Sequence, residues 1–171
     1  MSLPLAAKGE FARVRSNLES ALDKSGQPVR RGTMAHDHHV YMLLTEAAAA
    51  QRDPAALAVY APRLASLAER DGHRLYQGIA ARAQGVASRL AGDPAASAAH
   101  LDRAMGLFAA LGTRWQLGRT FLERAELARM LDDAAGARDF LARASAAFEA
   151  LQAAPDLERA RGALAQLQLT V

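Results

Sequence analysis

Hydrophobic side chains recur along this chain with a short spacing inside each segment and a long spacing between segments. Leu101 and Ala104 stand three positions apart, and Phe108 follows four positions later. These spacings place the three side chains on one face of an α-helix. The same face returns 40 residues later with Leu141 and Ala144. The pattern therefore predicts a series of similar amphipathic helices rather than one irregular bundle.

Residues that start and stop helices follow the same 40-residue period. Asp53 and Asp93 are each followed by proline, and Asp133 stands another 40 residues along. An aspartate before a helix can accept hydrogen bonds from free backbone N–H groups, and proline fits the first helical position. Glycines that fit the C-terminal ends of helices are Gly72, Gly92 and Gly112. The punctuation thus predicts where each helix begins and ends.

These signals predict an all-α chain of about eight helices in a single domain, residues 1–171. Residues 9–24 should form the second helix of a partial unit and 25–35 a loop. Three full helical hairpins are expected over 36–72, 74–112 and 114–153, and a C-terminal capping helix over 157–169. The helices inside the hairpins are expected at about 36–52, 54–70, 74–91, 94–111, 114–131 and 134–152.

Two prolines bear on these boundaries. Pro62 falls inside the helix expected over 54–70, where it removes one backbone hydrogen bond and should bend the helix. Pro155 precedes Asp156, which we expect to start the last helix.

The predicted array begins and ends in the middle of a hairpin. Its last helix carries polar residues suited to a cap, namely Glu158, Arg159, Arg161, Gln166 and Gln168. Its first helix carries Phe11, Val14 and Leu18, which we expect to be exposed at the open end. We expect the chain to be a piece of a larger protein. The alternative is a small free-standing protein whose partner covers that end.

Composition narrows the class of protein. β-branched and aromatic residues are scarce, with a single isoleucine and 5% aromatics, so strands are not expected. The absence of cysteine excludes disulfides and cysteine-based metal sites. No secretory leader and no apolar run of about 18 residues is present, so we expect a cytoplasmic protein without a membrane span. The net charge of +3 comes from arginines interleaved with acids, which argues against direct nucleic-acid binding.

One motif resembles a known repeat. The series Gly92-Asp93, Ser97, Leu101 and Ala104 is similar to the second half of a tetratricopeptide repeat. This resemblance implies antiparallel helix hairpins stacked as a right-handed α-solenoid, a TPR-like superhelix. The period of 40 exceeds the standard length of about 34, so each helix should be longer by nearly one turn.

The long-helix form looks like the arrays in large bacterial regulators of transcription and signalling, including ATP-binding transcription activators and nucleotide cyclases. The resemblance implies a non-catalytic scaffold that binds a protein or peptide partner, within a cytoplasmic regulator. No Gly-rich phosphate loop, nucleophile elbow or His-Glu-x-x-His pattern is present, so we expect neither an enzyme nor a cofactor.

The resemblance also implies that the first helices of successive units line a concave groove. The residues predicted to face it are His39, Met42, Glu46, Arg82, Val86, Arg89, Arg119, Leu122, Glu126 and Arg129, with Ala49, Ile79, Arg159 and Gln166 beside them. The planar guanidinium of arginine binds carboxylate and phosphate in a bidentate manner. An acidic or C-terminal peptide segment is therefore the expected ligand. The alternative is that these arginines pair with Glu123, Glu126 and neighbouring acids on a solvated surface.

Three further possibilities remain open from the sequence. His36 and His39 could share a helix face, but zinc sites need three or four ligands, so they are only weak metal candidates. A metal- or small-molecule-sensing domain built on this segment is one alternative function. A homodimer formed through the apolar open end is another. Trp115 could stack on a ligand, although we expect it to pack against Leu107 and Phe108 in the core.

Overall fold

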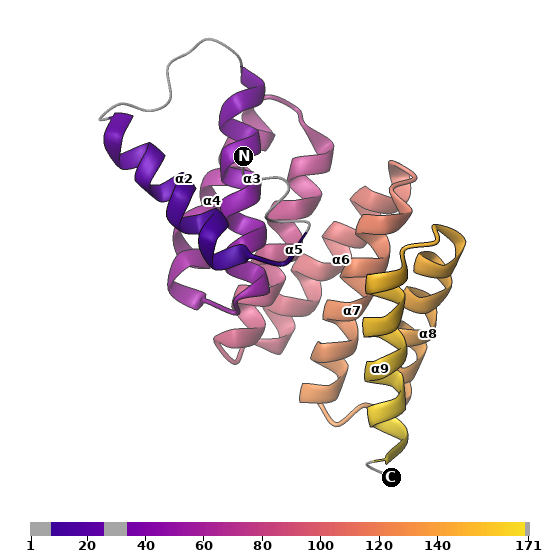
Figure 1. The fold of residues 1–171 in the computed structure, drawn as a ribbon. Helices are drawn as coiled ribbons and strands as arrows, with labels where there is room; N and C mark the ends of the chain where they lie inside the picture. The colour runs from indigo at the N-terminus through magenta and orange to yellow at the C-terminus, as the bar shows by residue number, and fades with distance from the viewer. Residues whose placement is uncertain (1–7, 26–33, 170–171) are drawn as a thin grey trace.

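The computed structural model describes residues 8–25 and 34–169, which fold into eight α-helices and no strand (Figure 1). This confirms the all-α class. The helices are α2 (Phe11–Ser25), α3 (Met34–Ala50), α4 (Pro54–Arg70), α5 (Arg74–Leu90), α6 (Pro94–Ala110), α7 (Arg114–Met130), α8 (Ala134–Ala150) and α9 (Ala154–Leu169).

The 40-residue period consists of two equal steps of 20 residues. From α4 onward each helix begins 20 residues after the previous one, and a three-residue turn joins successive helices. The middle residue of each turn has a left-handed backbone. Glycine supplies it at positions 72, 92 and 112, with φ between 65° and 77°, as the sequence predicted. Arg52, Asp132 and Gln152 adopt the same conformation with φ of 53° to 57°, at a cost of about 1 kcal/mol each.

The aspartates cap the helices as expected. The side chains of Asp53, Asp93 and Asp133 accept hydrogen bonds from backbone N–H groups three residues ahead, at 3.0, 2.9 and 2.8 Å. Several helices end one or two residues earlier than expected, and two begin earlier. Helix α9 begins at Ala154 instead of Asp156, because Pro155 fits the first turn, where its missing N–H breaks no helical bond. Helix α3 begins at Met34, inside the segment expected to be a loop.

The helices pack in two layers that differ in spacing. Each helix contacts its neighbour in sequence, so the chain is an array of paired helices. Helix α5 also contacts both α3 and α7, whereas among the described residues α4, α6 and α8 make no comparable contacts with one another. The α3–α5–α7 layer is therefore the more closely spaced one and forms the inner side of the array.

Small residues opposite large ones set how closely the helices approach. A Cβ atom added to Gly78 of α5 would lie 2.6 Å from Cε1 of Phe108 in α6. One added to Gly118 of α7 would lie 2.9 Å from Cε1 of Phe148 in α8. Both rings are fully buried. The missing side chain of each glycine thus makes room for a phenylalanine ring against the backbone of the preceding helix.

At the equivalent positions of the first hairpin, the small and large residues are exchanged between the two helices. Forty residues before Gly78 and Phe108 stand His38 and Ala68, so the large residue lies on the first helix and the small one on the second. His38 is 3% exposed and Ala68 is fully buried. Both positions are therefore buried in the first hairpin as well, although the larger residue lies on the other helix.

The apolar residues at the start of α2 are not at an open end, contrary to the expectation. Val14 is fully buried, and Phe11 and Leu18 pack against Leu43 and Ala47 of α3. Helix α2 covers α3 with these side chains because their spacing forms a single stripe. A dimer through the same residues would first have to remove α2 from α3.

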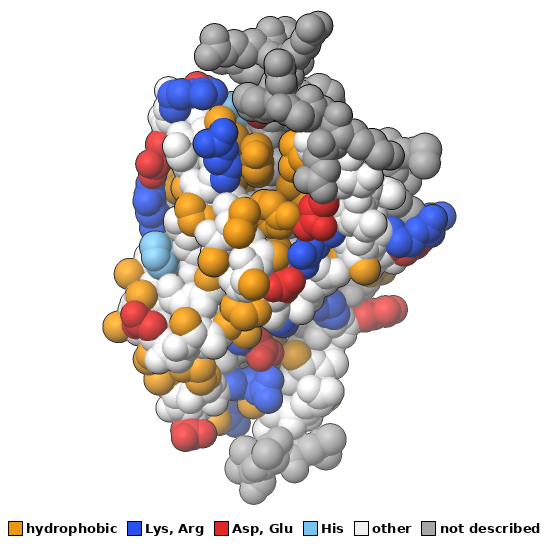
Figure 2. All heavy atoms as spheres, turned by 90° about the vertical axis from the view of Figure 1, so that its left-hand side faces the viewer, with side chains coloured by type: hydrophobic (Ala, Val, Ile, Leu, Met, Phe, Trp, Pro, Cys, Tyr) orange, Lys and Arg blue, Asp and Glu red, His pale blue; other side chains and the backbone are white. Residues whose placement is uncertain are grey.

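The side of the molecule formed by α2 and α4 carries small hydrophobic side chains among scattered charges of both signs (Figure 2). On α4 these exposed residues include Ala55, Ala58 and Val59. Within the described residues, no helix is both long enough and apolar enough to span a membrane.

Candidate binding site on the inner layer

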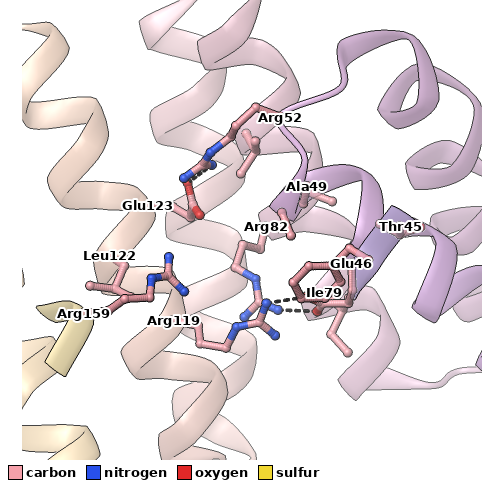
Figure 3. A pocket seen from close by; sticks show the side chains of 14 residues that line it. Thr45, Glu46, Ala49, Arg52, Ile79, Arg82, Arg119, Leu122, Glu123 and Arg159 are labelled. Atoms are coloured by element: carbon pink, nitrogen blue, oxygen red, sulfur yellow. Dashed lines mark hydrogen bonds and ion pairs between the residues drawn. The ribbon is translucent and has the colours of Figure 1, made fainter. Parts of the chain in front are cut away.

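A cavity of about 340 Å³ lies on the inner layer, between residues of α2, α3, α5, α7 and α9 (Figure 3). Its position follows from the layer arrangement, because equivalent faces of α3, α5 and α7 meet there. The charged residues in its wall are Glu46, Arg52, Arg82, Arg119, Glu123 and Arg159. The apolar residues are Phe11, Ala49, Ala50, Ile79, Ala83, Val86 and Leu122, and Thr45 completes the wall.

Glu46 of α3 joins the three inner helices. Its carboxylate accepts hydrogen bonds from Arg82 of α5 at 2.5 Å and from Arg119 of α7 at 2.6 Å. The Glu46 and Arg82 side chains are 12% and 6% exposed, so this is a buried ion pair and not a solvated one. Arg82 also donates to the backbone oxygen and the Oε1 of Gln116, at 3.1 and 2.6 Å. The guanidinium of Arg82 is therefore fixed from two sides.

The pairing determines the protonation of Glu46, Arg82 and Arg119, which we call the Glu46 trio. Burial by itself would raise the pKa of Glu46, but the charges and hydrogen bonds of Arg119 and Arg82 outweigh it and lower the pKa to about 2. Burial lowers the pKa of Arg82 to about 10, against the opposing charge of Glu46. All three groups are therefore ionised near neutral pH.

Glu123 of α7 forms a second trio of the same kind. Its Oε2 accepts hydrogen bonds from Arg52 in the turn after α3, at 2.6 Å, and from Arg89 of α5, at 2.9 Å. Burial opposes ionisation, yet the charges and hydrogen bonds of Arg52 and then the charge of Arg89 lower the pKa of Glu123. The Arg52–Glu123 and Glu46–Arg119 pairs connect the first hairpin directly to the third, across the inner layer.

The cavity carries more positive than negative charge. Each trio contains two arginines and one glutamate, and so has a net charge of +1. Arg159 enters the cavity from α9 (Figure 3). The nearest ion-pair partner of Arg159 is Asp156, at the long distance of 4.0 Å. The arrangement therefore suits a negatively charged ligand.

The predicted groove residues divide into two groups. The structure places Glu46, Arg82, Val86, Arg119 and Leu122 in the wall of the cavity, together with Ala49, Ile79 and Arg159. Arg89 supports the wall through Glu123, while His39, Met42, Glu126 and Arg129 lie outside it. Arg129 pairs with Glu126 at 3.2 Å on the exposed end of α7. Glu126 and Arg129 lie outside the cavity because α7 extends beyond it.

Arg52 and Phe11 line the cavity although the sequence reasoning did not assign them to it. Arg52 occupies the turn position that is glycine at residues 72, 92 and 112. The sequence signal for a special role of Arg52 was a large charged residue at a turn position that favours glycine. Phe11 gave no such signal, because its position depends on how α2 packs across α3.

Trp115 is not a core residue, which corrects the expectation that it packs against Leu107 and Phe108. Its side chain is 42% exposed, and its indole N–H donates to Asp156 of α9 at 2.8 Å. The guanidinium of Arg119 lies 4.8 Å from the ring centroid. Trp115 therefore supports Arg119 from the side, through a cation–π contact.

In the histidine segment 36–39, the described side chain of His38 packs against aromatic rings of the neighbouring helix hairpin. The His38 ring stacks on Tyr76 at 5.4 Å and lies 5.6 Å from the His73 ring. The Nε2 atom of His38 lies 3.2 Å from the backbone oxygen of Leu67. The side chain of His36, a weak metal candidate, lies outside the described residues. Among the side chains that are described, no three His, Asp or Glu form a group that could hold a metal ion.

No protein-family model matches this sequence, and no curated protein is significantly similar to it. The assignment of a function therefore depends on the geometry of the cavity and on the repeat pattern.

Proposed function

We propose that this protein is a TPR-like binding module that holds an anionic segment of a partner protein on its inner layer. The observation that carries the proposal is the cationic cavity between α3, α5 and α7. Two glutamates in its wall hold four arginines in place, and each trio keeps one positive charge in excess. Such fixed guanidinium groups bind carboxylates without a large loss of side-chain entropy.

A non-catalytic role is part of the proposal. Glu46, with a pKa of about 2, stays ionised near neutral pH and is too weak a base for efficient proton abstraction. Arg82 is tied to both Glu46 and Gln116, so its guanidinium serves to hold charge in one position. That this module serves a bacterial transcription or signalling regulator rests on the sequence resemblance alone and stays a prediction.

The test uses peptides selected from a random display library and titrated into the isotope-labelled protein. We expect the amide resonances of α3, α5 and α7 to shift, because the ligand should occupy the inner layer. Peptides that instead shift α4, α6 and α8 would place the binding surface on the outer layer and contradict the proposal. A library that yields no binder with measurable affinity would also contradict it.

Two variants on α9 sharpen this test. Arg159→Glu reverses a charge in the cavity wall, whereas Arg161→Glu reverses a similarly exposed charge that pairs with Glu149 outside the cavity. A charge-assisted hydrogen bond contributes about 1.5–3 kcal/mol, so the first variant should weaken peptide binding by at least about tenfold. The second should change the affinity by less than about twofold. Equal losses would mean that the net charge, and not the cavity, governs binding.

A further inference from the structure

We infer that the cavity takes a single carboxylate attached to an apolar group of side-chain size, either as a free organic acid or as the C-terminal residue of a peptide. This inference rests on the proposed function, because it assumes that the inner layer binds a ligand. It narrows the proposed ligand from an acidic segment in general to a molecule or residue that carries one carboxylate and one apolar group.

The charges in the wall favour one carboxylate over several. Glu46 and Glu123 remain in the cavity as fixed negative charges, each shared by two arginines. A ligand with several adjacent acids would bring some of them close to one of these glutamates. Like charges at such distances repel each other, so a polyacidic stretch loses at the second carboxylate what it gains at the first.

The rest of the wall favours an apolar body. Phe11, Ile79, Val86 and Leu122 come from three different helices and line the same cavity. A volume of about 340 Å³ lies within the range typical of sites for small molecules. A bare phosphate or sulfate would leave this apolar surface in contact with water, whereas a branched or aromatic group would cover it.

The arginines that pair with Glu46 and Glu123 are positioned before any ligand arrives. Arg119 is held between the Glu46 carboxylate and the Trp115 ring, at 2.6 Å and 4.8 Å respectively. Among the described residues, Arg159 has no comparably short ion pair, since Asp156 lies 4.0 Å away. The geometry therefore offers cations held by glutamates, such as Arg119, and one cation, Arg159, that can turn toward an incoming carboxylate.

Isothermal titration of the intact chain with five probes tests the inference. The probes are 4-methylpentanoate, N-acetyl-leucine, its neutral amide, inorganic phosphate and tri-glutamate. We expect the first two to bind at least about tenfold more tightly than the other three, because only they combine one carboxylate with a branched apolar body. Tighter binding of 4-methylpentanoate would identify a free acid as the better fit, and tighter binding of N-acetyl-leucine a peptide C-terminus. Phosphate or tri-glutamate binding as tightly as these would overturn the inference.

A matched pair of substitutions locates the binding. Ala50 is the last residue of α3 and lines the cavity, while Ala110 is the last residue of α6 and does not. Both are exposed, so neither substitution by phenylalanine should prevent folding. Ala50→Phe should weaken 4-methylpentanoate binding by about tenfold or more, and Ala110→Phe should leave it unchanged. Equal effects of the two variants would place the acid elsewhere and overturn the inference.

Failure of the inference can be told apart from failure of the proposed function. If selected peptides bind the inner layer but neither monocarboxylate binds, the peptide-binding function stands and the inferred ligand chemistry is wrong. If the monocarboxylates bind and no peptide does, the cavity is a small-molecule site and the peptide-binding proposal is wrong.

Discussion

The substitution Glu46→Gln tests whether the buried trio stabilises the fold. Glutamine has nearly the shape of glutamate but carries no charge, so Arg82 and Arg119 would face each other without a counter-ion. Because the pKa of Glu46 falls from 4.5 to about 2 on folding, its ionised form stabilises the native state. One pKa unit corresponds to about 1.4 kcal/mol, so the shift amounts to about 3 kcal/mol. Removing one partner of a buried ion pair costs a similar amount, about 3–5 kcal/mol.

The sign of the pH dependence follows from the lowered pKa. The contribution is complete above the unfolded-state pKa of 4.5 and is lost as the pH falls toward 2. Wild type should therefore exceed the variant in free energy of unfolding by about 3 kcal/mol at pH 7 and about 2.5 kcal/mol at pH 4. At pH 2.5 the difference should be less than about 1 kcal/mol.

Urea unfolding of both proteins, followed by circular dichroism at the three pH values, measures this difference. Other titrating groups cancel because they are common to both proteins. Glu149→Gln serves as the control, since its pair with Arg161 is exposed on both sides and should contribute less than about 1 kcal/mol. A wild-type advantage that is the same at pH 7 and pH 2.5 would show that the charge of Glu46 is not what stabilises the inner layer.

Four other predictions concern the packing and the ends of the helices. Gly78→Ala should lower the midpoint of thermal unfolding, by the equivalent of about 1–3 kcal/mol, because its Cβ would meet Phe108 at 2.6 Å. Gly106→Ala adds a Cβ atom that meets nothing within 4 Å, so it should raise the midpoint by the equivalent of up to about 1 kcal/mol. Asp93→Ala should cost about 1 kcal/mol in urea unfolding through loss of the helix cap. The fluorescence of Trp115 should be quenched readily by acrylamide, because the ring is 42% exposed; weak quenching would favour a core position.

Local chemistry made the helices predictable. Asp93 with its proline starts a helix and Gly92 precedes it in a left-handed turn, and both effects depend on only a few neighbouring residues. The apolar spacing of Leu101, Ala104 and Phe108 fixed one buried face in the same way. The predicted helix boundaries were wrong where local signals conflicted, as at Pro155, because a proline can either precede a helix or stand in its first turn.

The candidate site was only partly predictable. Glu46, Arg82 and Arg119 could be placed on one side of the array, because equivalent helix positions recur every 40 residues. Their pairing could not be foreseen, since Glu46 and Arg119 are 73 residues apart and meet only through the curvature of the inner layer. The prediction of a core position for Trp115 was wrong for a related reason, because its hydrogen-bond partner, Asp156, lies on the last helix.

The sequence by itself thus determined the helical class, the repeat and the caps, because these depend on side chains a few positions apart. The tertiary structure alone decided that Arg52 reaches Glu123, that Phe11 lines the cavity and that Trp115 stays at the surface. These contacts join helices that are not neighbours in sequence. Their geometry depends on how all the helices between them pack, which no pattern a few residues long specifies.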